Sequence, residues 1–187
     1  MVIIDKKKLR DIYLKKRTHV LHLEVSKKSK VIARKLLKMP EIRGKRNFSV
    51  YLPINNEVDT KIIIGKLIEQ GANIFVPYYS KSTDDYLFAR FGGWRDLEEG
   101  PYKIPQPKNS HPQESGLIEV AIIPGVAFSK NGVRTGYGKG VFDRLLAKSN
   151  ALKIGLAYDF QIVDEITHEE HDLLMDIIVT EKMVYRF

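Results

Sequence analysis

The chain has 187 residues, of which 43% are hydrophobic, and this is enough for one domain with a substantial core. The absence of cysteine excludes disulfides, thiolate chemistry and cysteine-based zinc sites. No apolar stretch approaches the roughly 18–20 residues that cross a membrane, and the apolar start is too short for a signal peptide, so we expect one cytoplasmic domain over residues 1–187.

The net charge of +8 is concentrated at one end of the sequence. Residues 1–46 contain 16 Lys and Arg against 4 Asp and Glu, a balance of +12, whereas the remaining residues contain 15 against 19, a balance of −4. Such asymmetry is typical of proteins that bind nucleic acid or an anionic ligand, and also of helices with solvated, lysine-rich faces.

Two helices are expected in this basic segment, packed on the remainder of the chain. Hydrophobic spacing predicts the first from Asp5 to about Leu21. Its inner face is expected to carry Leu9, Ile12, Tyr13 and Val20. The second is predicted to start after an N-cap at Ser26 and to end at Pro40. Its inner face is expected to carry Val31, Ile32, Leu36 and Met39.

Three cations of the first predicted helix lie at the edge of its apolar face. On a helical wheel, Lys6, Arg10 and Arg17 fall within about 40° of one another. Lys8 and Lys15 point away from that face, where solvation is the simpler interpretation. Cations that border a packing face are well placed to close over a cleft.

A βαβ unit is predicted next. Its strands are Phe48 to Leu52 and Ala72 to Val76, and its helix follows the capping signal Asp59-Thr60 and ends near Gln70. This order implies a parallel sheet with a right-handed crossover. Ligands of such sheets gather beyond the carboxyl ends of the strands, where Glu57 and Tyr78-Tyr79 are expected.

The later part of the chain alternates between further strands and polar segments. Residues 80–116 are interpreted as a long excursion over the sheet that includes a possible strand, Tyr86 to Phe91. Further strands are predicted at Val120 to Ile123, Lys153 to Ala157 and Asp176 to Val179. The HEEH sequence within 168–172 lacks the spacing of an HExxH metal site, so a solvated loop is preferred there.

A glycine-rich basic loop follows the strand at 120–123. Five glycines lie between Gly125 and Gly140, and a helix is predicted from about Gly140. Strand, glycine loop and helix start can together bind phosphate, although the spacing matches neither a P-loop nor the dinucleotide fingerprint. The alternative is a loop whose glycines only satisfy turn geometry. Asp143 in the first helical turn would either cap the helix or hold a divalent cation against phosphate.

Several motifs in this order resemble the 5-formyltetrahydrofolate cyclo-ligase family, also called 5,10-methenyltetrahydrofolate synthetases. The most specific is PGVAFSKNGVRTGYGKGVFDRLL at 124–146, which is similar to the family pattern PGxAFD followed by GxRLGYGxGYYDRxL. The supporting motifs are KKKLR at 6–10, YLPINNEVDT at 51–60, VPYY at 76–79, IPQP at 104–107 and HDLLMDIIVTE at 171–181.

The resemblance implies a fold and a reaction. The implied fold is a three-layer α/β/α sandwich with a largely parallel sheet, related to the ribose-phosphate isomerase and CoA-transferase group. The implied reaction is an ATP-dependent cyclisation of 5-formyltetrahydrofolate to 5,10-methenyltetrahydrofolate, a ligase reaction that forms a C–N bond. Mg²⁺ and ATP are the implied cofactors. The implied partner is the folate, with or without a chain of several glutamates, and the implied protein is a monomer.

The resemblance also carries site assignments onto this sequence. ATP contacts are expected from Lys6, Arg10, Arg134, Gly136, Tyr137, Gly138, Lys139, Gly140 and Phe142. Folate contacts are expected from Leu52, Glu57, Tyr79, Tyr137 and Val141. Lys139 and Arg134 are assigned catalytic roles, and Asp143 and Asp176 are assigned to the metal. Val141-Phe142 stands where the family usually has two tyrosines, so Phe142 keeps an aromatic ring without the hydroxyl and Val141 has no ring.

Two other functions remain possible from the sequence. One is an α/β protein that binds a phosphosugar or another nucleotide without folate chemistry. The other is a nucleic-acid-binding domain driven by the +12 segment, which would leave Glu57 and Asp143 without a role. We therefore expect neither nucleic acid nor a membrane as a partner.

Overall fold

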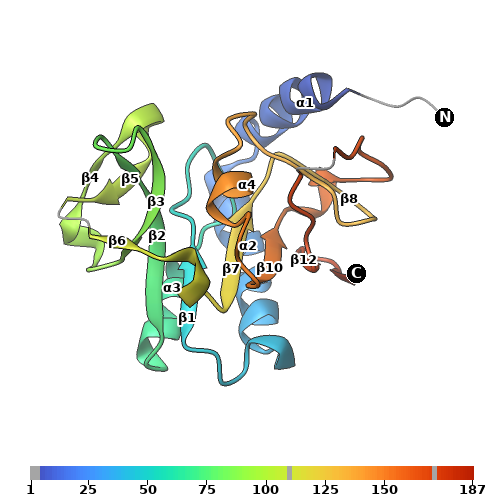
Figure 1. Cartoon of the computed structure of the whole chain (residues 1–187). Coiled ribbons are helices and arrows are strands. Elements are labelled where there is room, and N and C mark those ends of the chain that lie inside the picture. Colours follow the sequence, from blue (N-terminus) through green and yellow to red (C-terminus); the bar gives the residue numbers. More distant parts are fainter. Residues whose placement is uncertain (1–4, 109–110, 170–171) are drawn as a thin grey trace.

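The centre of the computed structural model, which describes residues 5–108, 111–169 and 172–187, is an eight-stranded sheet (Figure 1). Its five inner strands, from β12 to β2, run parallel, and its outer strands pair antiparallel. In spatial order the strands are β13 (Val184–Arg186), β12 (Ile177–Val179), β10 (Leu152–Leu156), β7 (Val120–Pro124), β1 (Asn47–Val50), β2 (Asn73–Ser80), β3 (Asp85–Arg90) and β6 (Pro112–Gln113).

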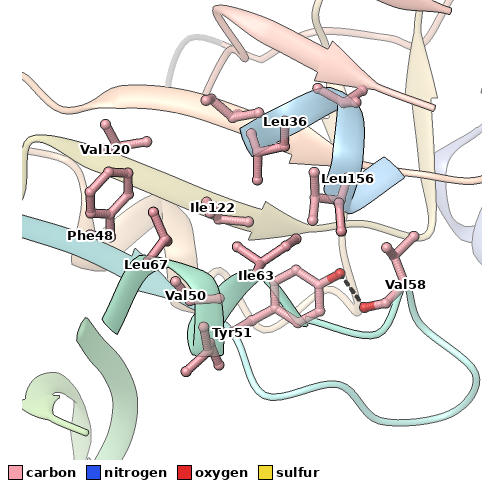
Figure 2. Packing of buried hydrophobic residues seen from close by; sticks show 14 of the residues in the cluster. Leu36, Phe48, Val50, Tyr51, Val58, Ile63, Leu67, Val120, Ile122 and Leu156 are labelled. Carbon is pink, nitrogen blue, oxygen red and sulfur yellow. Dashed lines mark hydrogen bonds between the residues drawn. The ribbon is translucent and has the colours of Figure 1, made fainter. Parts of the chain in front are cut away.

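Helices cover both faces of this sheet, which confirms the three-layer α/β fold. On one face, α2 (His22–Leu37) and α3 (Lys61–Glu69) pack Leu36 and Ile63 against Phe48 and Ile122 (Figure 2). Because side chains alternate along a strand, Ile123 faces the other side, where it meets a second buried cluster from α4 (Val141–Leu145) and its neighbours. The two clusters form the core.

The two N-terminal helices differ in detail from the sequence expectation. α1 (Lys6–Thr18) begins where predicted, because the side chain of Asp5 accepts the N–H of Lys7. The predicted N-cap at Ser26 is wrong: it lies inside α2, which already starts at His22. The N-cap position of α2 is Leu21, whose side chain cannot cap a helix. The turn from His22 to Val25, which precedes Ser26, is therefore already part of α2.

Ile12 and Val31 were expected on the buried inner faces of these helices, but their side chains are exposed. α1 rests on a small separate cluster rather than on the main core. Its buried members are Leu9, Ala127, Val133 and Ile166, with Tyr13 packed at the edge. A cluster of this size covers only a narrow stripe of α1, which leaves Ile12 outside it.

The second strand of the βαβ unit is longer than predicted and continues through Pro77. On one edge of β2, the pairing with β1 ends before Pro77. On the other edge, β2 pairs with β3 from Phe75 to Ser80. Tyr79 lies two residues after Pro77, so its N–H is directed to the same side as the Pro77 nitrogen. This N–H donates to the Gln106 side chain and not to β3. Proline therefore removes no ladder hydrogen bond to β3 at this position.

The excursion at 80–116 has structure of its own (Figure 1). The predicted strand in it is β3, and a separate two-stranded sheet pairs β4 (Leu97–Glu99) with β5 (Pro105–Pro107). Short 3₁₀ turns lie in this region and elsewhere: η1 (Pro40–Ile42), η2 (Trp94–Asp96), η3 (Pro101–Lys103), η4 (Ser115–Leu117) and η5 (Asp159–Gln161).

The glycine-rich segment after β7 is more ordered than a loop. It contains β8 (Ala127–Ser129) and β9 (Arg134–Thr135), which join β11 (Ile162–Val163) in a three-stranded sheet that was not predicted. α1 lies against β8 and β9. α4 begins directly after Gly140, as predicted, and ends at Leu145. In the described part of the chain, no helix has the length and apolarity that spanning a bilayer requires.

Candidate active site

A cavity of about 1060 Å³ opens where β7 and β1 end and the glycine-rich segment begins. Its size exceeds what a single drug-sized ligand usually occupies. Thirteen of the residues predicted from sequence line it. They are Lys6, Arg10, Leu52, Glu57, Arg134, Gly136, Tyr137, Gly138, Lys139, Gly140, Val141, Phe142 and Asp143. Segments far apart in sequence therefore meet at one site.

Glu57 is the most buried carboxylate of this cavity, with a side chain only 4% exposed. Its Oε2 accepts the N–H of Ile54 at 3.0 Å, and its Oε1 accepts the hydroxyl of Tyr137 at 3.3 Å. Nη2 of Arg17 lies 3.6 Å from the same Oε1. The turn after β1 therefore fixes this carboxylate from one side while α1 and the glycine-rich segment contact it from the other.

Arg17 is buried to the same degree and reaches from α1 to three other segments. Its Nε donates to the carbonyl of Asn55 at 2.9 Å, and its Nη1 donates to the carbonyl of Gly125 at 3.1 Å. Its Nη2 donates to the hydroxyl of Tyr137. We name Arg17, Asn55, Glu57 and Tyr137 the Glu57 cluster. Of these, the helical wheel placed Arg17 at the packing edge, but no local pattern indicated its partners.

Burial controls the ionisation of this cluster. It raises the pKa of Glu57, and the positive charge of Arg17 acts in the opposite direction. Burial also raises the pKa of Tyr137, and the charge of Glu57 adds to that increase. The Tyr137 hydroxyl is therefore a donor to Glu57, whose charged form depends on Arg17.

A second group of cavity residues is richer in charge and less buried. Nη2 of Arg134 lies 3.1 Å from each carboxylate oxygen of Asp143, and the N–H of Leu173 donates to Asp143 at 3.2 Å. Nζ of Lys6 lies 2.5 Å from Asp172. We name the cavity-lining residues Lys6, Arg10, Arg134, Lys139, Asp143 and Asp172 the charged cluster.

The segment 168–172 was expected to be a solvated loop, and the described part agrees at Glu169, which lies outside helices and strands with a side chain 55% exposed. Asp172 differs, because its side chain is only 13% exposed. Residues 170–171 lie outside the described residues. Glu169 and Asp172 line the cavity. Lys6 pairs with both, at 3.6 Å from Glu169 and 2.5 Å from Asp172. This pairing joins positions 166 residues apart in the chain, so no spacing within the segment itself could have indicated it.

Two glycines of the segment make room for guanidinium groups. A Cβ on Gly136 would lie 2.6 Å from Nη1 of Arg134, and one on Gly138 would lie 3.1 Å from Cζ of Arg10. Gly138 also has a φ of +83°, which favours glycine. Within the described part of the chain, Nε of Arg10 and Nε of Arg134 are buried without a hydrogen-bond partner. Such donors suit an anionic ligand.

Aromatic residues form another part of the wall. Nζ of Lys139 lies 5.4 Å from the ring centroid of Tyr102, and Cζ of Arg134 lies 5.9 Å from that of Phe142. Tyr86 also lines the cavity, and its buried hydroxyl has no hydrogen-bond partner among the described residues. No sequence pattern indicated either residue as part of a site, because Tyr86 belongs to a predicted strand and Tyr102 is an isolated aromatic residue in an irregular segment.

Tyr79 and Asp176 are the two predicted site residues that do not line the cavity. The hydroxyl of Tyr79 donates to Asp84, and its ring packs edge-on against Tyr86. Asp176 precedes β12, at the amino end of a parallel strand, and its carboxylate accepts the N–H of Lys153 at 2.7 Å. The ligand roles of both residues remain predictions.

The donor set fits a magnesium ion that is shared with phosphate. No group of three or more acidic or histidine side chains that could hold a metal occurs in the described ranges. Asp143 and Asp172 nevertheless line the same cavity, and the hydrogen bond from Leu173 brings their segments into contact. One or two carboxylates, completed by water and substrate phosphates, are the usual protein ligands of Mg²⁺.

Comparisons with known proteins agree with this arrangement. The family model described as the 5-formyltetrahydrofolate cyclo-ligase family matches residues 2–181. A 5-formyltetrahydrofolate cyclo-ligase from Mycoplasma genitalium is 31% identical over 183 residues, which cover 95% of this chain and 98% of that protein.

Solved structures give the same result. The solution structure of a 5,10-methenyltetrahydrofolate synthetase from Aquifex aeolicus superposes with a TM-score of 0.85 at 29% identity, covering 97% of this chain and 92% of that one. A 5,10-methenyltetrahydrofolate synthetase from Mycoplasma pneumoniae superposes with a TM-score of 0.77 at 26% identity, covering 95% and 99%.

Proposed function

The chain belongs to the 5-formyltetrahydrofolate cyclo-ligase family, and on that premise we propose that it uses ATP to close 5-formyltetrahydrofolate to 5,10-methenyltetrahydrofolate, releasing ADP and phosphate. The observation that carries this proposal is the joining of two unlike groups in one cavity. The charged cluster suits the phosphates of a nucleotide, and the Glu57 cluster offers one buried carboxylate among apolar walls. Binding of a nucleotide alone would leave the Glu57 cluster without a role.

The reaction requires activation of an amide oxygen, which is a weak nucleophile and a poor leaving group. In the proposed sequence, the formyl oxygen attacks the γ-phosphorus of ATP and ADP leaves. N10 of the folate then attacks the formyl carbon, loses its proton, and the phosphate departs with the former formyl oxygen. The protein must align the formyl oxygen with the γ-phosphorus and stabilise charge on the transferring group.

Fixed cations would provide that stabilisation. Lys6 and Arg10 are assigned to the ATP phosphates from α1, where the buried Nε of Arg10 has no partner among the described residues. Arg134 and Lys139 are assigned to the transferring phosphoryl group, together with the segment from Gly136 to Phe142. Nζ of Lys139 is held only by the ring of Tyr102 in the described contacts, so it can move to a phosphate without breaking an ion pair.

Magnesium would neutralise further charge on the phosphates. We assign Asp143 as one ligand. The family resemblance indicated Asp176 as the second, but the cavity wall favours Asp172, because Asp172 lines it and Asp176 does not. When Asp172 turns to a metal, Lys6 becomes available for a phosphate oxygen.

The folate is assigned to the side of the cavity that contains Leu52, Glu57, Tyr137 and Val141. A pterin ring presents adjacent N–H donors that match the two oxygens of a carboxylate, and such charge-assisted pairs are strong. Tyr86 and Tyr102 also line the cavity. Tyr79 packs edge-on against Tyr86 but does not line the cavity, so it would contact the folate only after a change in the cavity wall.

The test is to mix the protein with Mg-ATP and 5-formyltetrahydrofolate and to follow the absorbance of the methenyl product together with ADP. Both products are expected in equal amounts, and neither is expected when ATP or the protein is omitted. ADP without methenyl product, or no reaction by folded protein, would contradict the proposal. Phosphosugar or nucleotide binding without folate turnover would then be preferred.

Nucleic-acid binding has less support. Three cations of the basic segment, Lys6, Arg10 and Arg17, are directed to the cavity and to buried partners rather than to an open surface. Affinity for oligonucleotides that falls steeply with salt would be the contrary result.

A further inference from the structure

We propose that Arg17 is a positioning residue for the folate: it holds the Glu57 carboxylate in place and in its charged form. This inference rests on the proposed function, in which Glu57 binds the pterin ring. Arg17 itself is not among the residues that line the cavity, so it acts on the substrate through Glu57 and Tyr137.

The geometry leaves Arg17 almost no freedom. Three of its nitrogen atoms donate hydrogen bonds, to the carbonyls of Asn55 and Gly125 and to the hydroxyl of Tyr137. These partners belong to the turn after β1, the end of β7 and the glycine-rich segment. A planar guanidinium can satisfy three such directions at once, whereas a lysine ammonium cannot reach them with the same fixed geometry.

The contact with Glu57 is electrostatic as well as geometric. Nη2 of Arg17 lies 3.6 Å from Oε1 of Glu57, and both side chains are almost completely buried. The other polar groups around this carboxylate, the N–H of Ile54 and the hydroxyl of Tyr137, are neutral donors. Tyr158 donates to the backbone carbonyl of Glu57, and the hydroxyl of Tyr51 donates to Val58. Arg17 is therefore the cation that stabilises a carboxylate in this dry environment.

The consequence concerns pH. Burial raises the pKa of Glu57, and the Arg17 charge opposes that rise. Without the charge, the pKa of Glu57 should move higher still, so the carboxylate should become protonated at a higher pH. A protonated Glu57 loses acceptor capacity toward the pterin N–H groups. Folate affinity should then fall at a pH where the unmodified protein still binds.

The experiment measures folate binding as a function of pH in Arg17→Gln and Arg17→Lys. In Arg17→Gln, folate affinity at neutral pH should fall at least about tenfold, and the acidic limb of the affinity profile should move up by about 1 pH unit or more. Arg17→Lys retains the positive charge but not the planar, forked set of guanidinium donors. Its folate affinity should fall while the acidic limb of the profile stays close to its original pH.

Two controls separate this role from a structural one. Lys15→Gln, on the exposed side of the same helix, should leave folate affinity and its pH profile unchanged. In a Glu57→Gln background, Arg17→Gln should add less than about threefold to the loss of affinity, because the residue through which Arg17 acts is already changed. ATP affinity and the melting temperature of each variant are measured alongside.

The outcomes are distinct. If Arg17→Gln folds and binds folate less tightly with an unmoved acidic limb, or if its effect adds fully to that of Glu57→Gln, the inference is wrong and Arg17 is only structural. If Arg17→Gln does not fold, Arg17→Lys decides, and wild-type folate affinity in that variant overturns the inference. If Glu57→Gln itself leaves folate affinity unchanged, the proposed role of Glu57 fails, and the inference fails with it.

Discussion

The charged cluster and the Glu57 cluster both pair cations with carboxylates, but they differ in burial. The side chains of Arg17 and Glu57 are 1% and 4% exposed, whereas those of Lys6 and Asp172 are 14% and 13% exposed. The pairs of the charged cluster are only partly buried, so separating them should cost less than separating Arg17 from Glu57. In the Glu57 cluster, removing one partner leaves a charge with nothing to compensate it.

Under the proposed function, this difference assigns different tasks to the two clusters. A nucleotide and its metal bring their own charges, so the residues that receive them must exchange partners, as Lys6 and Asp172 can. A pterin ring brings neutral donors, so its acceptor must already be aimed and ionised. Preorganisation is therefore expected at Glu57 and rearrangement at the charged cluster. The variants below test this contrast, from the largest expected effect to the smallest.

Loss of Lys139 should have the largest effect. Lys139→Ala should lower kcat by about a hundredfold or more, because one group that stabilises the charge of a transition state typically contributes about 2.7–4 kcal/mol. Lys8→Ala, on the exposed face of α1, is the matched control and should leave kcat unchanged. The kcat of each variant is measured by steady-state kinetics, from the rates at which the methenyl product and ADP form. Similar rates for the two variants would remove Lys139 from the chemistry.

The acidic residues come next. Asp143→Asn should lower Mg-ATP turnover by at least about tenfold, because Asp143 is the proposed metal ligand next to the glycine-rich segment and the metal would stabilise the charges of the phosphates. Asp172→Asn should follow, and Asp176→Asn should be mildest, because Asp176 lies outside the cavity wall. The dependence of rate on Mg²⁺ concentration provides the measurement. A larger loss in Asp176→Asn would restore the original assignment of that residue to the metal.

Glu57→Gln tests the preorganised side. Replacing one acceptor by a donor should raise the folate KM by roughly 1–3 kcal/mol in equivalent free energy, with ATP affinity unchanged. Because the pKa of Glu57 is raised by burial, folate affinity in the unmodified protein should be complete above that pKa and should fall as pH drops through it. Calorimetric titrations of folate and ATP decide, and a lower melting temperature with normal folate affinity would leave Glu57 a purely structural part.

The smallest effect is expected at the rim. Arg144 lines the cavity and pairs with Asp85 at 2.8 Å, with both side chains well exposed. The hydrogen bond from Arg144 lowers the pKa of Asp85, so the pair stabilises the fold above the unfolded pKa of aspartate, and this contribution is lost as pH falls through the lower folded-state pKa. Asp85→Asn should therefore change stability at neutral pH by less than about 1 kcal/mol, as followed by urea unfolding.

Local signals predicted the central part of the fold. The strands around Phe48 and Ile122 and the helix between 61 and 69 are regular and strongly apolar, so their type and order follow from spacing and connection length. The three-stranded sheet was missed because strands as short as Arg134–Thr135 show no periodicity. The start of α2 was missed because its first turn has no capping side chain, while Ser26 offered a false one.

The candidate site was predictable where its residues share one motif or one helix face. Lys6, Arg10 and the glycine-rich segment all reach the cavity. What the sequence could not supply was pairing at long range. Arg17 meets Glu57, and Lys6 meets Asp172, only because the fold brings distant segments together. The sequence likewise could not show that Asp172 lines the cavity and Asp176 does not, and this decides which of them is proposed as a metal ligand.

The position of β1 in the middle of the sheet has a consequence for biosynthesis. β1 pairs with β2 on one side and with β7 on the other, so Phe48 lies opposite both Ile74 and Val120. As the chain emerges from the ribosome, β2 arrives soon after β1, but one edge of β1 stays open until the much later β7 has been made. Open edges invite pairing with other chains, and non-local parallel pairing is slow. Insertion of β7 is also the event that brings the glycine-rich segment to the cavity. The nascent protein is thus expected to hold an incomplete sheet, with an exposed edge, before the cavity has formed.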